Sequence, residues 1–266
     1  MNIAYAQLLL LGALAGFTIY LGLPLAFIPR VGKKTKSFLN VFSAGVLIFL
    51  LYEIMEEMFE EVGHNYLELQ QGLATSGELT GQIFLMVIGL VIGLGGLIIF
   101  ENKYIAKSNP ETQLSRRGSH LALMIAIGIG LHNLGEGLAI GQAFIQGSMG
   151  LAFTLVIGFG LHNATEGFGI VAPMSGEKPR MRFIALLGLI GGGPTFLGTL
   201  VGSFYASEIL EIIFLSIAAG SILYVVVKLL QIEYRVKQYE ASLAGALSGF
   251  FLAWGSEWVA KAAMHF

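Results

Sequence analysis

Residues 81–101 read GQIFLMVIGLVIGLGGLIIFE, and the first charged side chain in this stretch is Glu101 at its end. A helix needs roughly 20 apolar residues to cross the hydrocarbon core of a bilayer, so the stretch predicts a transmembrane helix. Comparable windows recur along the chain, at about residues 3–28, 38–59, 81–101, 120–144, 149–173, 181–205, 209–231 and 242–262. We therefore expect an all-α integral membrane protein in which residues 1–266 form one transmembrane domain of eight spans.

The overall composition agrees with a membrane protein and excludes several other classes. Of the 266 residues, 55% are hydrophobic and only 12% are charged, which is too apolar for a soluble domain of this length. A net charge of −2 lacks the excess of basic residues on which nucleic-acid binding depends. The chain has no cysteine, so disulfides, thiolate metal sites and cysteine nucleophiles are excluded. A bound metal would need nitrogen and oxygen ligands.

The charged residues alternate with the expected spans. Of the fifteen Lys and Arg residues, all except Lys261 lie at or after the end of an odd-numbered span: Arg30, Lys33, Lys34, Lys36, Lys103, Lys107, Arg116, Arg117, Lys178, Arg180, Arg182, Lys228, Arg235 and Lys237. Because cytoplasmic loops carry an excess of basic residues, we expect both termini to be extracytoplasmic. Acidic residues gather on the other side, at the end of the second span and beyond it: Glu53, Glu56, Glu57, Glu60, Glu61, Glu68 and Glu78. They would attract a cation from outside, although a solvated helix end has the same composition.

The fourth and fifth spans contain an internal repeat. Its two copies are GIGLHNLGEG at residues 128–137 and GFGLHNATEG at residues 158–167. Residues four apart share one face of a helix, so His132 lies beside Glu136, and His162 lies beside Glu166. A turn near Gly147 would make the two helices antiparallel, which predicts that both His–Glu pairs lie at a similar depth near the middle of the membrane.

Four ionisable groups at one depth in a bilayer need a common explanation. Such groups are costly in hydrocarbon and persist mainly when paired, facing a cavity or bound to an ion. A lone buried histidine is more often satisfied by a hydrogen bond, but the duplication of the pair favours a metal site. Imidazole and carboxylate together suit zinc and other first-row divalent ions. The other histidines, His64, His120 and His265, lie in or near expected loops, where we expect them to be solvated.

The repeated motif resembles that of the ZIP (Zrt/Irt-like protein) family, whose fourth and fifth helices carry HNxxEG-type motifs. The eight spans, the outside termini and the FLSIAAG segment at residues 214–220 are also similar to that family. The resemblance implies a multi-pass cell-membrane transporter that moves a divalent transition metal, zinc above all, into the cytoplasm by alternating access. It also implies a transport site made by His132, Glu136, His162 and Glu166, with Asn133 and Asn163 as further candidate ligands.

The same resemblance implies a protein that is not an enzyme and has no resident cofactor, because the metal ion is its substrate. Its partners would be that ion and the lipid bilayer, with no nucleic acid; a homo-oligomer is left open. Proton coupling and the choice among zinc, iron, manganese, cobalt and cadmium are also left open, because the ligand set fits several of these ions.

The chain departs from two-metal members of that family at two positions. Where those members carry a further acid in helix five and a glutamate before a proline in helix six, this chain has Asn163 and Gly193. Glu136 and Glu166 balance the charge of one divalent ion, so we expect a single-metal site unless Glu53 supplies further charge. Lys228 also stands where an acid is expected in some relatives, and a lysine near a helix end can reach the membrane interface with its charged group.

Two other functions compete with transport. An intramembrane metal-dependent hydrolase would use a metal with an open coordination position to activate water. The chain has no HExxH motif and no nucleophile elbow to support that reading. A channel-like protein that binds metal only for gating is the third reading.

Glycines spaced four apart, as at Gly89 and Gly93 or Gly198 and Gly202, suit static close packing and sliding helix bundles equally well.

Overall fold

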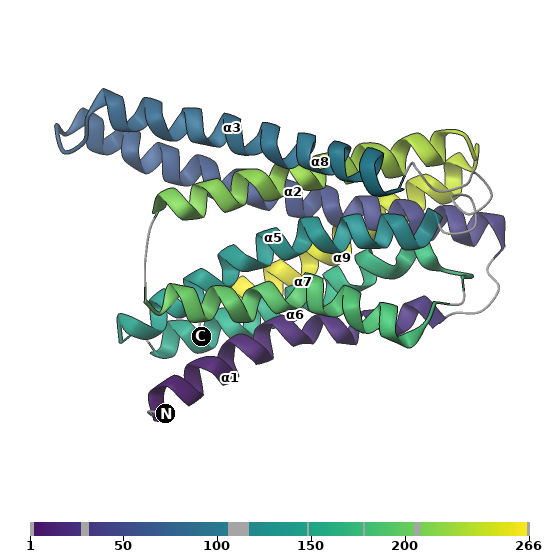
Figure 1. Cartoon of the computed structure of the whole chain (residues 1–266), viewed down its shortest axis with the longest axis horizontal. Helices are drawn as coiled ribbons and strands as arrows, with labels where there is room; N and C mark the ends of the chain where they lie inside the picture. Colours follow the sequence, from purple (N-terminus) through teal and green to yellow (C-terminus); the bar gives the residue numbers. More distant parts are fainter. Residues whose placement is uncertain are drawn as a thin grey trace.

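The computed structural model describes residues 3–27, 32–105, 117–147, 149–177, 179–204 and 208–264. All regular structure in these ranges is helical, which confirms the all-α expectation. The long helices are α1 (Ile3–Phe17), α2 (Lys33–Gln70), α3 (Ser76–Phe100), α5 (Arg117–Ile145), α6 (Met149–Val171), α7 (Met181–Gly202), α8 (Glu208–Tyr234) and α9 (Tyr239–Met264). Short turns continue three of them: η1 (Thr18–Leu21) and η2 (Leu23–Phe27) after α1, η3 (Glu101–Ile105) after α3, and η4 (Ala172–Met174) after α6. The long helices run along one common direction (Figure 1).

Seven helical segments in the described ranges are long and apolar enough to cross a membrane. They are Tyr5–Phe27, Lys33–Gln70, Ser76–Lys103, Gly118–Ile145, Gly150–Met174, Met181–Gly202 and Ile209–Tyr234. The eighth expected span, 242–262, is helical as part of α9, which has 26 residues. Serines and Glu257 interrupt its apolar sequence, so it is less hydrophobic than the other seven. It packs along α2 and α6, where its polar groups meet other protein groups.

Helix α2 is longer than the sequence pattern predicts. We expected it to end near residue 59 and to be followed by an acidic loop, but the helix continues to Gln70. Hydropathy does not detect this extension because its residues are polar. These residues nevertheless form side-chain pairs that stabilise a helix, such as Nδ1 of His64 with Oε1 of Glu68 at 3.8 Å. The chain then turns at Gly72, whose φ of 74° is in the left-handed region. Helix α3 begins with a capping box between Thr75 and Glu78.

The helices pack as two groups. In the first helix group, α5 and α1 each pack along α6 and α7; in the second helix group, α2 packs along α8 and α9, and α3 packs along α8. In Figure 1, α1, α6 and α7 lie on the lower side, and α2, α3 and α8 lie on the upper side. The groups meet mainly where α5 packs on α8 and α6 packs on α9.

Glycines make the packing within each group much closer than the packing between groups. A Cβ atom built on Gly137 would overlap the carbonyl oxygen of Thr195 on α7, and one built on Gly220 would overlap that of Leu90 on α3. Between the groups, a Cβ on Gly128 would instead meet the side chain of Ile222 at 3.3 Å. Backbones therefore touch within a group, whereas side chains separate the two groups.

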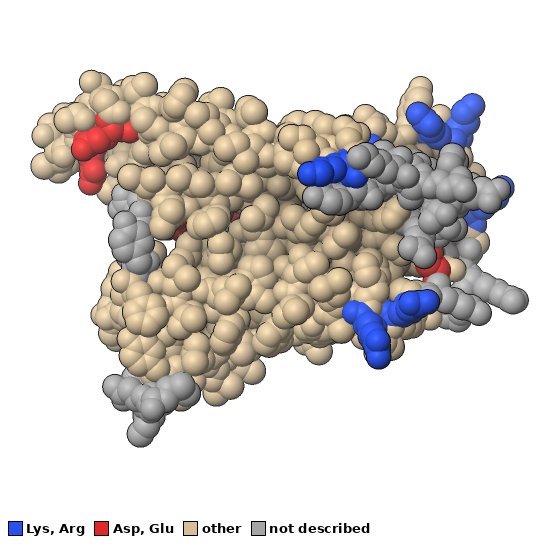
Figure 2. Space-filling model, in the orientation of Figure 1, with Lys and Arg blue, Asp and Glu red and all other residues tan. Residues whose placement is uncertain are grey.

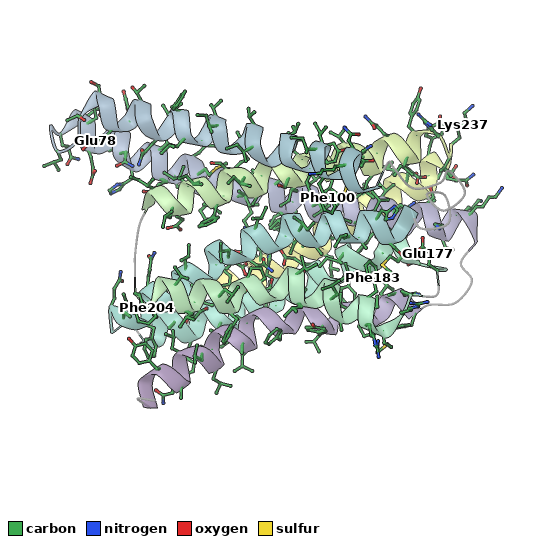
Figure 3. The ribbon with its side chains drawn as sticks, viewed as in Figure 1. Glu78, Phe100, Glu177, Phe183, Phe204 and Lys237 are labelled. Carbon is green, nitrogen blue, oxygen red and sulfur yellow. The ribbon has the colours of Figure 1, made fainter. Side chains whose placement is uncertain are left out.

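The two ends of the molecule differ in charge, although Glu177 lies at the basic end (Figure 2, Figure 3). Lys and Arg side chains gather at one end, and acidic side chains of the α2–α3 hairpin lie at the other (Figure 2). Figure 3 shows Glu78 at the hairpin end, and Lys237 and Glu177 at the opposite end. Both termini lie toward the hairpin end (Figure 1). This arrangement has the asymmetry expected from the sequence, and the extracytoplasmic location of the termini stays a prediction.

Lys228 forms a local ion pair, which explains the presence of a charged side chain in α8. Its Nζ lies 2.8 Å from Oε1 of Glu101, at the end of α3, and Glu101 also accepts a hydrogen bond from the hydroxyl of Tyr224. The lysine therefore joins α8 to the end of α3 inside the second helix group.

Candidate metal-binding site

The repeat folds as one turn of each of two neighbouring helices in the first helix group. Helix α5 carries His132, Asn133 and Glu136, and helix α6 carries His162, Asn163 and Glu166. The chain reverses direction between the helices at Gly147, whose φ is 75°. All six side chains belong to residues that are more than nine-tenths buried. The structure thus brings the six predicted site residues to one place between the helices.

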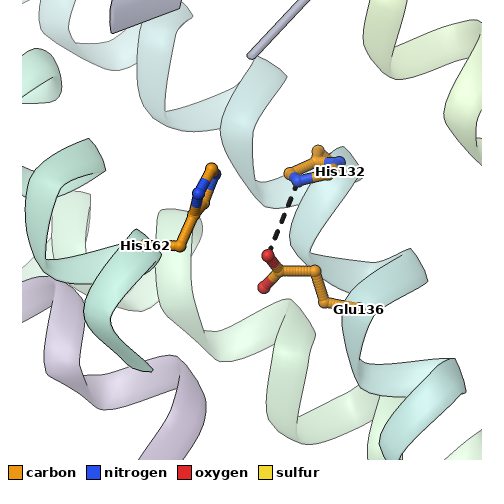
Figure 4. Close-up of side chains that lie close together, drawn as sticks. All are labelled: His132, Glu136 and His162. Atoms are coloured by element: carbon orange, nitrogen blue, oxygen red, sulfur yellow. Dashed lines mark ion pairs between the residues drawn. The ribbon is translucent and has the colours of Figure 1, made fainter. Parts of the chain in front are cut away.

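The four predicted principal ligands lie close together without bonding to one another at normal hydrogen-bond length. Nε2 of His132 is 3.6 Å from Oε1 of Glu136, and Nε2 of His162 is 3.4 Å from Oε1 of Glu166. The two imidazole rings are 6.0 Å apart. Ligand atoms of His132, Glu136 and His162 all lie within 4.8 Å of one another, and these side chains converge in Figure 4.

Several polar atoms of this cluster have no hydrogen-bond partner within the described part of the chain. They are both ring nitrogens of His132, both ring nitrogens of His162, and Oε1 of Glu166. A buried polar atom without a partner costs about 1–3 kcal/mol, so five such atoms in one cluster would be unfavourable if the cluster were purely structural. A cation held between α5 and α6 would satisfy one nitrogen of each ring together with the carboxylate oxygen, because the two nitrogens of one imidazole point in different directions.

The two asparagines connect the glutamates of the opposite helices. Nδ2 of Asn133 donates to Oε2 of Glu166 at 3.1 Å, and Nδ2 of Asn163 donates to Oε2 of Glu136 at 3.2 Å. Asn133 also donates to Oδ1 of Asn163 at 2.6 Å. One oxygen of each glutamate is therefore held by an amide, while the other points toward a histidine. In this arrangement the asparagines position the carboxylates, and Oδ1 of Asn133 is the amide oxygen that is left without a partner in the described ranges.

The asparagines also fix the site to the rest of the first helix group. Asn133 donates to the carbonyl oxygen of Gly191 on α7 at 3.0 Å, and Asn163 donates to that of Ala15 on α1 at 3.1 Å. Side chains of α5 and α6 are thus tied to the backbones of α1 and α7, so the four helices position the site together.

Two further carboxylates reach the cluster from the second helix group. Oε2 of Glu53 on α2 is 3.6 Å from Nε2 of His162, and Oε2 of Glu257 on α9 is 3.7 Å from Nδ1 of His162. Ligand atoms of these three residues also lie within 4.8 Å of one another. Sequence reasoning identified Glu53 only as an acid that might supply charge, and it missed Glu257. An acid inside the apolar stretch 242–262 was the signal that could have indicated it.

The remaining sequence-derived candidates are Gly193 and the three other histidines. Gly193 is buried in α7, and a Cβ built on it would meet the side chain of Leu189 at 3.4 Å. His64 is exposed on the polar part of α2, as expected, although it lies on a helix instead of in a loop. His120 is half-buried in the first turn of α5, so it is less solvated than His64. His265 lies outside the described residues.

Comparison with known protein families gives an independent result. A family model described as ZIP Zinc transporter matches residues 101–253. The matched part contains α5 to α8 with both copies of the repeat, and it ends shortly before Glu257. No individual curated protein gave a significant match. The match covers the two helices that carry the predicted ligands.

Proposed function

Because this chain belongs to the ZIP family of zinc transporters, we propose that it carries zinc into the cytoplasm through the His–Glu site between α5 and α6. Membership implies transport of divalent metal ions across a membrane, and the family consists of transporters and not of enzymes. The preference for zinc, the inward direction, the location in the cell membrane and the mechanism are our proposals for this chain.

The observation that carries the proposal is the set of buried imidazole nitrogens that face carboxylates without a hydrogen-bond partner in the described chain. Zinc is bound by histidine nitrogen and carboxylate oxygen at about 2.0–2.2 Å, in most sites with four ligands. Two ligand atoms at such distances around a tetrahedral ion are separated by about 3.4 Å. The separations of 3.6 Å for His132 with Glu136 and 3.4 Å for His162 with Glu166 are close to this value.

The division of charge along the molecule supports an inward direction. The acidic α2–α3 hairpin lies at the end that the positive-inside rule assigns to the outside, so cations would concentrate there. An interior-negative potential favours inward movement by about 2.3 kcal/mol per charge per 100 mV, hence about 4.6 kcal/mol for a divalent ion. Both effects act in the same direction on a metal cation.

The packing of the two helix groups supports alternating access. The four principal ligands lie on α5 and α6 of the first helix group, and the asparagines attach them to α1 and α7. Because backbones touch within each group and side chains separate the groups, the first helix group can move as a unit against the second with little loss of internal packing. Such a movement would take the site from one side of the membrane toward the other.

Uptake by reconstituted protein tests the proposal. Purified protein in liposomes that contain a zinc-sensitive dye should show saturable zinc uptake, which separates a carrier from a channel. His132→Ala and Glu166→Gln should each abolish most of this uptake. His64→Ala, which changes an exposed histidine on α2, is the matched control and should transport like the wild type. Uptake that survives both site variants would overturn the proposal.

A further inference from the structure

We propose that a second cation position lies beside the transport site, formed by Glu53 of α2, His162 of α6 and Glu257 of α9. This proposal rests on the function proposed above, because it concerns how an ion reaches that site. We name these three residues the outer position, and we name His132, Glu136, His162 and Glu166 the inner position. His162 belongs to both, so one ion would occupy the two positions in turn.

The geometry of the outer position resembles that of the inner one. Nε2 of His162 lies 3.6 Å from Oε2 of Glu53, and Nδ1 of His162 lies 3.7 Å from Oε2 of Glu257. One ligand atom from each of the three residues lies within 4.8 Å of the other two. These separations exceed those of a normal hydrogen bond to a charged group, about 2.7–2.9 Å. Each separation alone is close to the separation of about 3.4 Å between two ligands of one tetrahedral zinc ion. Since one ion binds the ring through one nitrogen, only one of the two separations would be used at a time, and the other carboxylate would bind from within the 4.8 Å group.

Hydrogen bonding alone does not account for the surroundings of His162. A neutral imidazole has one N–H, yet this ring faces Glu53, Glu166 and Glu257 from three helices, at 3.4–3.7 Å. Its side chain is 3% exposed, and neither nitrogen has a hydrogen-bond partner in the described ranges. Oε2 of Glu53 is also buried without such a partner there. A cation would satisfy these atoms from either side of the ring.

Charge also favours two positions used in turn. Glu53 and Glu257 balance one divalent ion at the outer position, just as Glu136 and Glu166 do at the inner position. Simultaneous occupancy would require both nitrogens of His162 to bind metal, which a neutral imidazole with one N–H cannot do. We therefore keep the expectation that one ion is bound at a time, which was based on the charge of two carboxylates. Four carboxylates line the path of this ion.

The outer position lies at the boundary between the helix groups and at the end of a row of acids. Glu53 and Glu257 belong to the second helix group, whereas His162 belongs to the first. Glu57 and Glu61 follow Glu53 at intervals of four along α2, toward the acidic hairpin, so the three share one helix face. Glu57 also lies within electrostatic range of Glu53 and His132. A cation arriving along this face would meet the outer position first, and His162 would then pass it to the inner position.

The test removes two of the three ligands that belong only to the inner position, and Glu166 is kept. In detergent, zinc binding by the wild type is compared with that of a His132→Ala/Glu136→Gln variant by calorimetry, and the histidines bound to zinc are counted by X-ray absorption. We expect the double variant to retain one zinc ion, held at least tenfold more weakly and with one histidine ligand in place of two. Adding Glu257→Gln should weaken this residual binding at least a further tenfold, and Glu53→Gln should do the same.

The control substitution is Glu240→Gln, which changes an exposed acid in the first turn of the same helix, α9. It should leave the residual binding unchanged. The outer position would be overturned if the double variant binds no zinc, or if neither Glu53→Gln nor Glu257→Gln changes its residual binding. Either result would leave the transport function in place. Absence of zinc binding by the wild type would instead contradict the transport function itself.

Discussion

Replacing Asn163 by alanine should weaken zinc binding without removing any of the four principal ligands. Asn163 holds Oε2 of Glu136 by a 3.2 Å hydrogen bond, and this bond fixes the direction in which Oε1 points toward His132. A hydrogen bond to a charged group contributes about 1.5–3 kcal/mol. Groups that orient a metal ligand typically change metal affinity by about 10–100-fold, or about 1.4–2.8 kcal/mol. The two ranges agree, so we expect a 10–100-fold loss of affinity.

The same substitution affects stability through a different contact. Asn163 also donates to the carbonyl oxygen of Ala15 at 3.1 Å, which would lose this partner whether or not zinc is bound. That loss lowers the stability of the first helix group and cancels in the binding measurement. The assay is therefore zinc calorimetry for affinity, together with thermal unfolding in detergent without metal for stability.

A matched control and a double variant complete this test. Asn65→Ala removes a helix-surface amide that donates to the carbonyl oxygen of Glu61 at 3.3 Å, and it should leave zinc affinity unchanged. Since Asn133 and Asn163 share a 2.6 Å hydrogen bond, the losses from Asn133→Ala and Asn163→Ala should not add in the double variant. Zinc affinity within twofold of the wild type for Asn163→Ala would refute the positioning role.

Three further predictions follow from the topology, the glycine contacts and the ligand chemistry. Single cysteines introduced at residues 2 and 265 of this cysteine-free chain should be labelled by an impermeant reagent in intact cells, and protection of either would contradict extracytoplasmic termini. Gly93→Ala should lower the unfolding temperature because its Cβ would overlap the carbonyl oxygen of Ile217, whereas Gly95→Ala on the same helix meets nothing within 4 Å and should be neutral or stabilising. Zinc affinity should fall as the pH is lowered, because imidazole binds metal only when neutral and carboxylate only when ionised; equal calorimetric affinity at neutral and mildly acidic pH would argue against these ligands.

The sequence predicted the helices well because the bilayer imposes a simple rule on length and polarity. The apolar stretch 81–101 corresponds to α3, and the repeat in the fourth and fifth spans corresponds to facing turns of α5 and α6. The polar extension of α2 to Gln70 was missed because hydropathy measures apolar length, and a helix that leaves the apolar region no longer follows that rule.

The site was predicted only in part because spacing along one helix fixes local neighbours alone. Positions four apart identified His132 with Glu136 and His162 with Glu166. The contact of His162 with Glu257 depends on how α6 and α9 rotate and pack against each other, which no local pattern encodes. The crossed hydrogen bonds of the asparagines depend on helix rotation in the same way.

The central claim is that the transported ion is held between α5 and α6, and a zinc-bound structure with anomalous scattering data tests it most directly. The account predicts an anomalous peak within about 2.0–2.2 Å of histidine nitrogen and carboxylate oxygen, among His132, Glu136, His162 and Glu166. A peak found only on the acids of the α2–α3 hairpin, with none between α5 and α6 at saturating zinc, would contradict it.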